Sequence, residues 1–157
     1  MKGMLRRAIL LLTLLATAFP MQASTRNIQE VRQGDLIVIE GGWETRLTGI
    51  RCPTLSDPYG KEAYDFTRSS IEGNRVALFT LTSDNTATGI IRDEEGLPRG
   101  EIWFGENYSR ELNVELLKQG LAVLDSTYLP DDKTATYSAA EYHAKKLKIG
   151  MWSEGAD

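Results

Sequence analysis

Residues 46–54 read RLTGIRCPT, and this stretch decides the fold. Its first half belongs to an extended run over Trp43–Ile50. The glycine pair Gly41-Gly42 separates that run from an earlier apolar one, Ile28–Ile39. Two such runs joined by a short glycine turn predict a β-hairpin. The sequence therefore predicts a pair of antiparallel strands, and the first half of the quoted stretch belongs to the second of them.

Short helices and strands alternate after this hairpin. Strands are expected at Arg75–Leu81 and on either side of the acidic turn Asp93–Pro98. Three helices are expected from their apolar spacing and end signals: one between Ser56-Asp57-Pro58 and Gly73, one at Leu112–Gln119, and one at Tyr137–Lys148. Short strands in meander order with three helices predict a small β-barrel with packed helices, an α+β fold.

The first 23 residues, MKGMLRRAILLLTLLATAFPMQA, have the layout of a secretory signal peptide. A basic start precedes the apolar run Ala8–Phe19, and the small residue Ala23 follows it. The run has about 12 residues, well short of the roughly 20 that span a bilayer. We expect cleavage near Ala23, one domain over residues 24–157, a periplasmic or secreted protein, and no stable membrane anchor after cleavage.

Charge and composition exclude several kinds of function. Removing the three basic residues of the leader leaves 15 basic residues against 22 acidic ones, a net charge of −7. This charge does not favour non-specific binding of nucleic acid. The chain has one cysteine, Cys52, and one histidine, His143, so it forms no intramolecular disulfide, cysteine-built zinc site or multi-histidine metal centre. We expect Cys52 to be a buried thiol, with an intermolecular link as the alternative.

Five segments of the sequence, in order, resemble the staphylococcal-nuclease-like (thermonuclease) family. They are Gly34-Asp35 (compare D-G-D-T), Arg46–Thr54 (R-L-x-G-I-D-T-P-E), Gly60–Ala63 (G-x-E-A), Leu112–Ala122 (L-N-x-x-L-V-x-x-G-L-A) and Ala140–Glu154 (E-A-x-A-K…G-x-W-S-E). The resemblance extends from about Val31 to Glu154, nearly the whole domain. It implies a five-stranded OB-fold barrel with about three packed α-helices.

The resemblance also implies a site that splits phosphodiester bonds with one Ca²⁺ held by carboxylates, two phosphate-binding arginines and a glutamate that activates water. Arg46 matches the first of these arginines and Arg99 the second. Asp35 matches a metal-binding aspartate. Gln33 and Leu36 depart from the first Asp and the Thr of D-G-D-T. Two further departures fall on residues that the chemistry needs, because Arg51 stands where the second metal-binding aspartate belongs and Thr54 where the glutamate base belongs.

These departures weaken the family's chemistry. A guanidinium in place of a carboxylate turns attraction for a dication into repulsion, a swing on the order of 10 kcal/mol before relaxation. Losing the general base costs about 10²–10⁴ in rate. We therefore expect Ca²⁺ binding to be weak or absent. Arg46, Arg51 and Arg99, without the usual compensating carboxylates, should form an anion-binding cleft for a phosphate-bearing or acidic small ligand.

The sequence leaves the activity open. Substitute acids exist, but we expect Asp57 to cap the first helix and Asp93-Glu94-Glu95 to be a solvated hairpin tip. The leading interpretation is an exported binding or accessory protein with a degraded catalytic site. One alternative is an active metal-dependent nuclease with a rearranged acid. Another is an accessory factor in envelope or exopolysaccharide biosynthesis. Whether nucleic acid is a ligand stays open.

Overall fold

A computed structural model of the chain describes residues 24–83 and 89–153, so the expected signal peptide lies outside the described residues. The strands are β1 (Ser24–Gln33), β2 (Leu36–Ile39), β3 (Trp43–Leu47), β4 (Ile50–Arg51), β5 (Arg75–Thr80), β6 (Arg99–Phe104), β7 (Arg110–Glu111) and β8 (Val123–Leu124). The helices are α1 (Gly60–Ile71), α2 (Leu112–Lys118) and α3 (Thr134–Leu147). Short 3₁₀ turns are η1 (Glu106–Tyr108), η2 (Ser126–Tyr128), η3 (Asp131–Lys133) and η4 (Gly150–Trp152).

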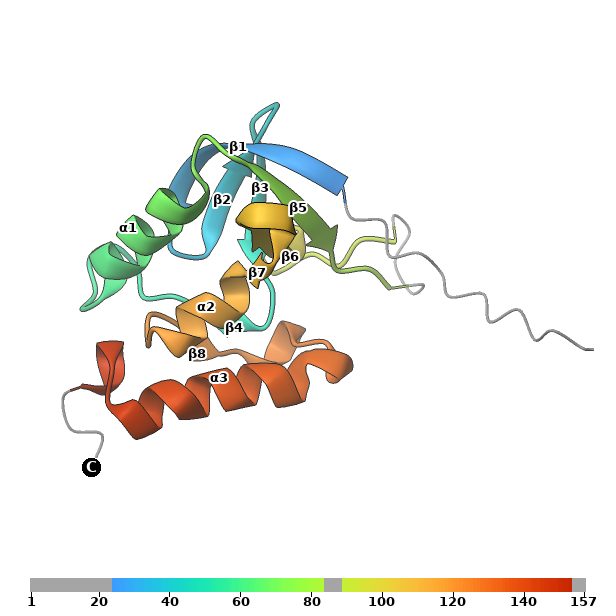
Figure 1. The fold of residues 1–157 in the computed structure, drawn as a ribbon. Coiled ribbons are helices and arrows are strands. Elements are labelled where there is room, and N and C mark those ends of the chain that lie inside the picture. Colours follow the sequence, from blue (N-terminus) through green and yellow to red (C-terminus); the bar gives the residue numbers. More distant parts are fainter. Residues whose placement is uncertain (1–23, 84–88, 154–157) are drawn as a thin grey trace, which may run out of the picture.

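Five strands form a closed barrel in the order β3-β2-β1-β5-β6 (Figure 1). Neighbours in this order are antiparallel, and a parallel pairing of β3 with β6 closes the ring. In the closing pair Arg46 lies opposite Arg99, and Leu47 lies opposite Gly100. The five-stranded barrel with three helices expected from the sequence is confirmed. Closure brings residues 46 and 99 side by side.

The chain reverses direction inside the run Ile28–Ile39, which the sequence suggested was one extended element. β1 ends at Gln33, the turn Gly34-Asp35 follows, and β2 pairs back onto β1. Thr67 of α1 holds this turn by donating a hydrogen bond from its hydroxyl to the Gly34 carbonyl oxygen at 2.7 Å. A Cβ atom at Gly34 would lie 2.8 Å from the Cys52 Sγ, so the close approach requires glycine.

The start of α1 differs from the sequence expectation. The residue before the helix is Tyr59, in a left-handed conformation with φ 65°, and no side chain caps the helix. Asp57 instead accepts hydrogen bonds from the Thr54 backbone N–H (3.1 Å) and from the Thr54 hydroxyl (2.7 Å). The prediction that Asp57 caps the first helix is therefore wrong, because its carboxylate closes the preceding turn.

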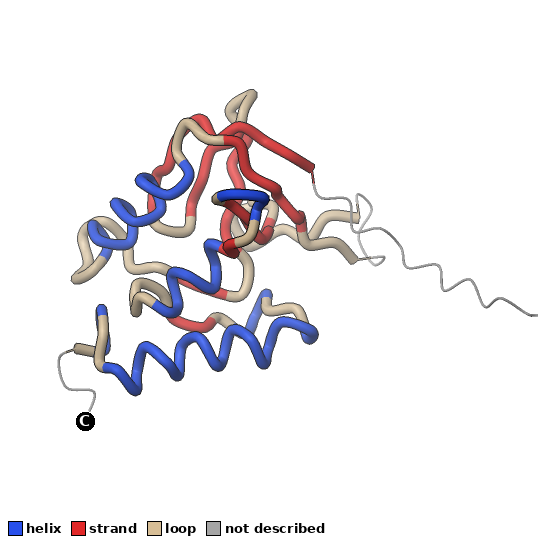
Figure 2. The backbone as a smooth tube through the Cα atoms, viewed as in Figure 1, coloured by secondary structure: helices blue, strands red, loops and turns tan. Residues whose placement is uncertain are grey.

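The helices lie to one side of the barrel strands (Figure 2). The hydrophobic core fills the barrel and continues under the helices. α3 packs mainly against α2 and β8, on the side away from β1. It buries Tyr137, Ala140 and Ala144 as expected, whereas Leu147, also expected on this face, is exposed in the last turn. Cys52 is a buried free thiol, as expected. Of the helices in the described residues, none has the length and apolar character needed to cross a membrane.

A buried polar cluster connects the start of α3 to the barrel. The Lys133 ammonium lies 2.8 Å from a Glu101 carboxylate oxygen and 3.4 Å from a Glu111 one, and the Tyr137 hydroxyl donates to Glu111. Burial raises the pKa of the Glu111 carboxyl and of the Tyr137 hydroxyl. Burial opposes the charge of Lys133, but the hydrogen bonds and charges of the two glutamates outweigh it and raise the pKa of Lys133.

We expect the fold to lose stability as the pH rises above about 10. Lys133 and Tyr137 hold their protons more tightly in the fold than in the unfolded chain, because their folded pKa values are raised. Such groups contribute full stability below their unfolded pKa and lose it as the pH rises through the folded pKa. Urea denaturation at several pH values should show this loss, and Tyr137→Phe should reduce its slope. A free energy of unfolding that stays constant from about pH 8 to about pH 11 would contradict the prediction.

Candidate anion-binding site

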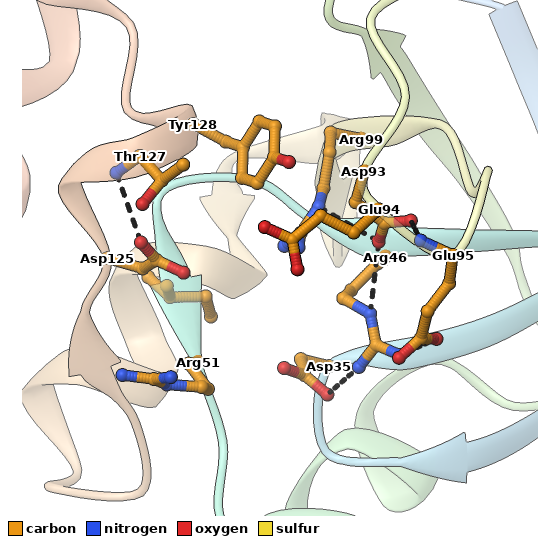
Figure 3. A pocket seen from close by; sticks show the side chains of 11 residues that line it. Asp35, Arg46, Arg51, Asp93, Glu94, Glu95, Arg99, Asp125, Thr127 and Tyr128 are labelled. Carbon is orange, nitrogen blue, oxygen red and sulfur yellow. Dashed lines mark hydrogen bonds and ion pairs between the residues drawn. The ribbon is translucent and has the colours of Figure 1, made fainter.

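The closing strand pair forms one wall of a cavity of about 320 Å³ (Figure 3). Three arginines and five carboxylates line it together with two polar residues of η2: Arg46, Arg51, Arg99, Asp35, Asp93, Glu94, Glu95, Asp125, Thr127 and Tyr128. The cavity thus contains the site residues predicted from the sequence, apart from Thr54. It also contains more carboxylates than guanidinium groups.

Arg46 contacts carboxylates through all three of its side-chain nitrogens. Its Nη1 lies 3.4 Å from Asp35 Oδ1, and its Nε lies 3.4 Å from Asp93 Oδ2. Its Nη2 lies 2.9 Å from Glu95 Oε2. The guanidinium is partly buried, which strengthens these ion pairs relative to surface ones.

Arg99 is built into the cavity wall and is only 7% exposed. Its guanidinium carbon lies 4.4 Å from the centre of the Tyr128 ring, and its Nη1 donates to the Leu47 carbonyl oxygen at 3.1 Å. Its Nε is 3.3 Å from Asp93 Oδ2 but makes no hydrogen bond. One carboxylate oxygen of Asp93 therefore lies between the Nε atoms of both arginines.

The acidic hairpin is not the solvated tip that the sequence suggested. The Asp93 side chain is only 6% exposed. Its Oδ1 accepts hydrogen bonds from the backbone N–H groups of Glu95 and Leu97, at 3.0 and 2.9 Å. The prediction fails for Asp93 because barrel closure brings this hairpin against Arg46 and Arg99. Glu94 and Glu95 are exposed, as expected of a tip.

Arg51 stands apart from the other two arginines. It is exposed on β4, and Figure 3 shows it across the cavity from the Arg46–Arg99 pair, near Asp125. Within the described part of the chain, no carboxylate forms an ion pair with it. The prediction of three clustered arginines without compensating carboxylates is therefore wrong. Arg46 and Arg99 lie together and are paired with carboxylates, whereas Arg51 lies across the cavity and has no ion pair among the described residues.

Comparison with protein families matches residues 44–154, most of the chain, to the family described as "Staphylococcal nuclease homologue". The chain belongs to this family. Among its relatives, the thermonuclease of Staphylococcus intermedius is 30% identical over 135 residues, which cover 80% of this chain and 74% of that protein. The thermonuclease of Staphylococcus hyicus is 29% identical over 139 residues, covering 82% and 76%.

A longer relative is the staphylococcal-like nuclease CAN1 of Arabidopsis thaliana, which is 28% identical over 116 residues. These residues cover 74% of this chain but only 31% of CAN1, so the chain spans about a third of that protein. The family match includes four of the predicted site positions, Arg46, Arg51, Thr54 and Arg99, and begins after Asp35. The nucleases of this family depend on calcium in general.

The residues of this staphylococcal nuclease homologue do not fit a calcium ion. Asp35 is buried, and its two oxygens face Arg46 Nη1 and the Cys52 backbone N–H (3.2 Å). Burial raises the pKa of the Asp35 carboxyl, although the Cys52 N–H and Arg46 act in the opposite direction. Over residues 24–83 and 89–153, no three His, Cys, Asp or Glu side chains lie close enough together to hold a metal. By resemblance to the family, the Arg51 guanidinium stands where a hard oxygen ligand of Ca²⁺ is needed.

Thr54, at the family's base position, lies outside the arginine cavity. Its hydroxyl donates to Asp57 and lies 3.0 Å from the Ser56 hydroxyl oxygen. Thr54 and Asp57 line a neighbouring hollow, which Arg51 shares with the cavity. The hydroxyl has no affinity for a proton near neutral pH, so it cannot serve as a general base.

Sequence reasoning did not assign three residues to the site. Asp93 and Glu95 are the carboxylates that pair with Arg46, and Tyr128 stacks on Arg99. The acidic run beside Arg99 was visible in the sequence, but its partner Arg46 comes from a strand far along the chain. No sequence signal marked Tyr128, because η2 is held at the cavity by contacts between distant segments: the Thr48 hydroxyl donates to the Tyr128 carbonyl oxygen, and the Asp125 N–H donates to the Gly49 carbonyl oxygen.

Proposed function

We propose that this staphylococcal nuclease homologue binds phosphate esters through Arg46 and Arg99 and does not hydrolyse them by the calcium-dependent route of its family. The observation that carries the proposal is the pairing of Arg46 with Arg99 across adjacent strands in the wall of one cavity. Guanidinium groups match the oxygens of a phosphate in geometry as well as charge. Two of them at a separation fixed by the barrel can bind one phosphate group.

The loss of hydrolysis is supported by three independent features. Arg51 stands at the position of a calcium ligand, Arg46 already engages the remaining ligand Asp35, and Thr54 is bonded to Asp57 outside the cavity. Absence of the base alone costs about 10²–10⁴ in rate. Absence of the dication removes the charge that would stabilise the developing negative charge on the phosphoryl oxygens. Together these features favour binding without turnover.

The charge of the protein favours small ligands over long polyanions. The chain carries a net charge of −4, and the domain after the expected signal peptide would carry −7. Five carboxylates around the cavity add local repulsion. We therefore propose that the ligand is a small phosphate ester met outside the cytoplasm, which follows if the leader directs export.

The test is to incubate the purified protein with single-stranded DNA and RNA in Ca²⁺, in other divalent ions or in chelator. We expect no cleavage above background under any of these conditions. Thymidine 5′-monophosphate should bind equally well with and without chelator. Arg46→Ala should weaken this binding by about tenfold to a hundredfold, the usual effect of losing a charge-assisted hydrogen bond. Calorimetry measures the dissociation constants.

Arg32→Ala provides the matched control, because Arg32 is an exposed arginine that pairs with Glu44 and does not line the cavity. This variant should bind the nucleotide as the wild type does. Robust hydrolysis by the highly purified wild type, abolished by Arg46→Ala, would contradict the proposal. The protein would then be an active nuclease with a rearranged acid.

A further inference from the structure

The acidic hairpin already supplies anions to the two arginines of the proposed binding site. Asp93 Oδ2 is within 3.4 Å of the Nε atoms of both Arg46 and Arg99. Glu95 Oε2 accepts a hydrogen bond from Arg46 Nη2 at 2.9 Å. A phosphate oxygen approaching Arg46 from the cavity would need that same Nη2 donor. Part of the site is therefore occupied by the chain's own carboxylate.

The two carboxylates differ in how firmly they are held. Asp93 is buried, and its second oxygen is tied to the backbone N–H groups of Glu95 and Leu97. The Glu95 side chain is 69% exposed, and Arg46 provides the one contact of its carboxylate within the described residues. Arg46 is partly buried but the Glu95 carboxylate is exposed, so water competes for the glutamate end of this pair, and the pair is weaker than those that Arg46 makes with the buried Asp35 and Asp93 side chains. Asp93 is thus a fixed part of the turn, whereas Glu95 can leave.

We propose that Glu95 is an internal competitor of the phosphate ligand. It occupies Arg46 Nη2 when no ligand is bound and swings into solvent when a phosphate oxygen takes its place. Asp93 stays in position and keeps the Nε atoms of both arginines directed toward itself. Because Arg46 Nη1 faces Asp35 and Arg99 Nη1 donates to Leu47, the Nη2 atoms of the two arginines are the ones left for the ligand. This role rests on the proposed function and adds a regulation of the same site.

The competitor role predicts two measurable effects. Removing the Glu95 charge makes Arg46 Nη2 available and tightens ligand binding. It also steepens the salt dependence of binding, because salt in the wild type weakens the Arg46–Glu95 pair as well as the contact between Arg46 and the ligand, and the two effects partly cancel. Tighter binding that came only from the changed net charge of the protein would persist when the Arg46 guanidinium is removed.

The experiment measures the affinity of the purified protein for thymidine 5′-monophosphate by calorimetry at low and high salt. We expect Glu95→Gln to bind about threefold to fivefold more tightly than the wild type at low salt. Its affinity should fall more steeply as salt is added. The matched control is Glu94→Gln, which removes the same charge from the same cavity lining but breaks no ion pair among the described residues. It should tighten binding less than twofold, because it lowers the repulsion in the cavity without releasing a donor of Arg46.

Equal tightening by Glu94→Gln and Glu95→Gln would overturn the competitor role and leave the proposed function intact. Adding Arg46→Ala distinguishes the two claims. If Glu95 acts through Arg46, the pair Arg46→Ala with Glu95→Gln binds no better than Arg46→Ala alone. A gain from Glu95→Gln that persists without Arg46 also overturns the competitor role. Nucleotide binding that Arg46→Ala leaves unchanged overturns both this role and the proposed function.

Discussion

Gly60→Ala should destabilise the protein by about 4 kcal/mol or more, a loss in the exceptional range for one substitution. A Cβ atom at Gly60 would lie 1.7 Å from the Thr54 carbonyl oxygen and 2.5 Å from the Thr54 carbonyl carbon. The obstacle is backbone, so no side-chain rotation relieves it. The segment from Thr54 to Gly60 would have to open, and with it the entry to α1.

Gly73→Ala is the matched control for this prediction. Gly73 follows the same helix and has φ +73°, but a Cβ atom there would meet nothing within 4 Å. Its cost is the left-handed backbone conformation alone, about 1–2 kcal/mol. Urea denaturation of the wild type and both variants measures the difference. A Gly60→Ala protein within about 1 kcal/mol of the wild type would show that the close approach is not required.

The largest expected change in activity comes from putting the family's residues back at positions 51 and 54. Arg51→Asp should restore weak calcium binding, because it replaces a guanidinium with a carboxylate in the cavity that Asp35 also lines. Little turnover is expected, since a base is still missing. Arg51→Asp combined with Thr54→Glu should give detectable calcium-dependent phosphodiesterase activity that requires Arg46. The rate should stay well below that of an intact family enzyme, because Glu95 still engages Arg46.

Two measurements separate these steps. A calcium-dependent rise in the melting temperature of Arg51→Asp reports metal binding independently of activity. Cleavage of single-stranded DNA reports turnover in the double variant. Thr54→Glu alone should show neither effect, because Arg51 still repels the dication. Calcium that fails to stabilise Arg51→Asp would contradict the assignment of position 51.

The barrel and the convergence of Arg46 and Arg99 could be predicted because five sequence segments match the family in the same order along the chain. These segments specify the strands and the way the barrel closes. The pairing of residue 46 with residue 99 follows once β3 and β6 are neighbours. The environment of Asp93 could not be predicted in the same way. An acidic turn with Gly96 and Pro98 is typical of a solvated tip, and only the closed barrel places it against two arginines.

Side-chain directions were the other missing information. The sequence gives Arg51 the same charge as Arg46, but β4 pairs with β8 and not with the barrel strands, so Arg51 lies across the cavity. Asp57 was similarly placed at a helix start by its position before Pro58. Its carboxylate instead bonds to Thr54, because the helix begins three residues later, at Gly60. Both errors concern contacts set by packing between segments rather than by local pattern.

Because Cys52 is buried, the rate at which its thiol reacts with a reagent measures how often the turn beside the ligand cavity opens. Cys52 is the single cysteine of the chain, it lies under the Gly34-Asp35 turn, and burial raises the pKa of its thiol. Alkylation of the Cys52 thiol should therefore be slow in the folded protein and faster when the turn separates from residues 50–54. The same separation breaks the bond between the Cys52 N–H and Asp35. The rate of thiol modification therefore reports on the opening that releases Asp35 from the Cys52 N–H.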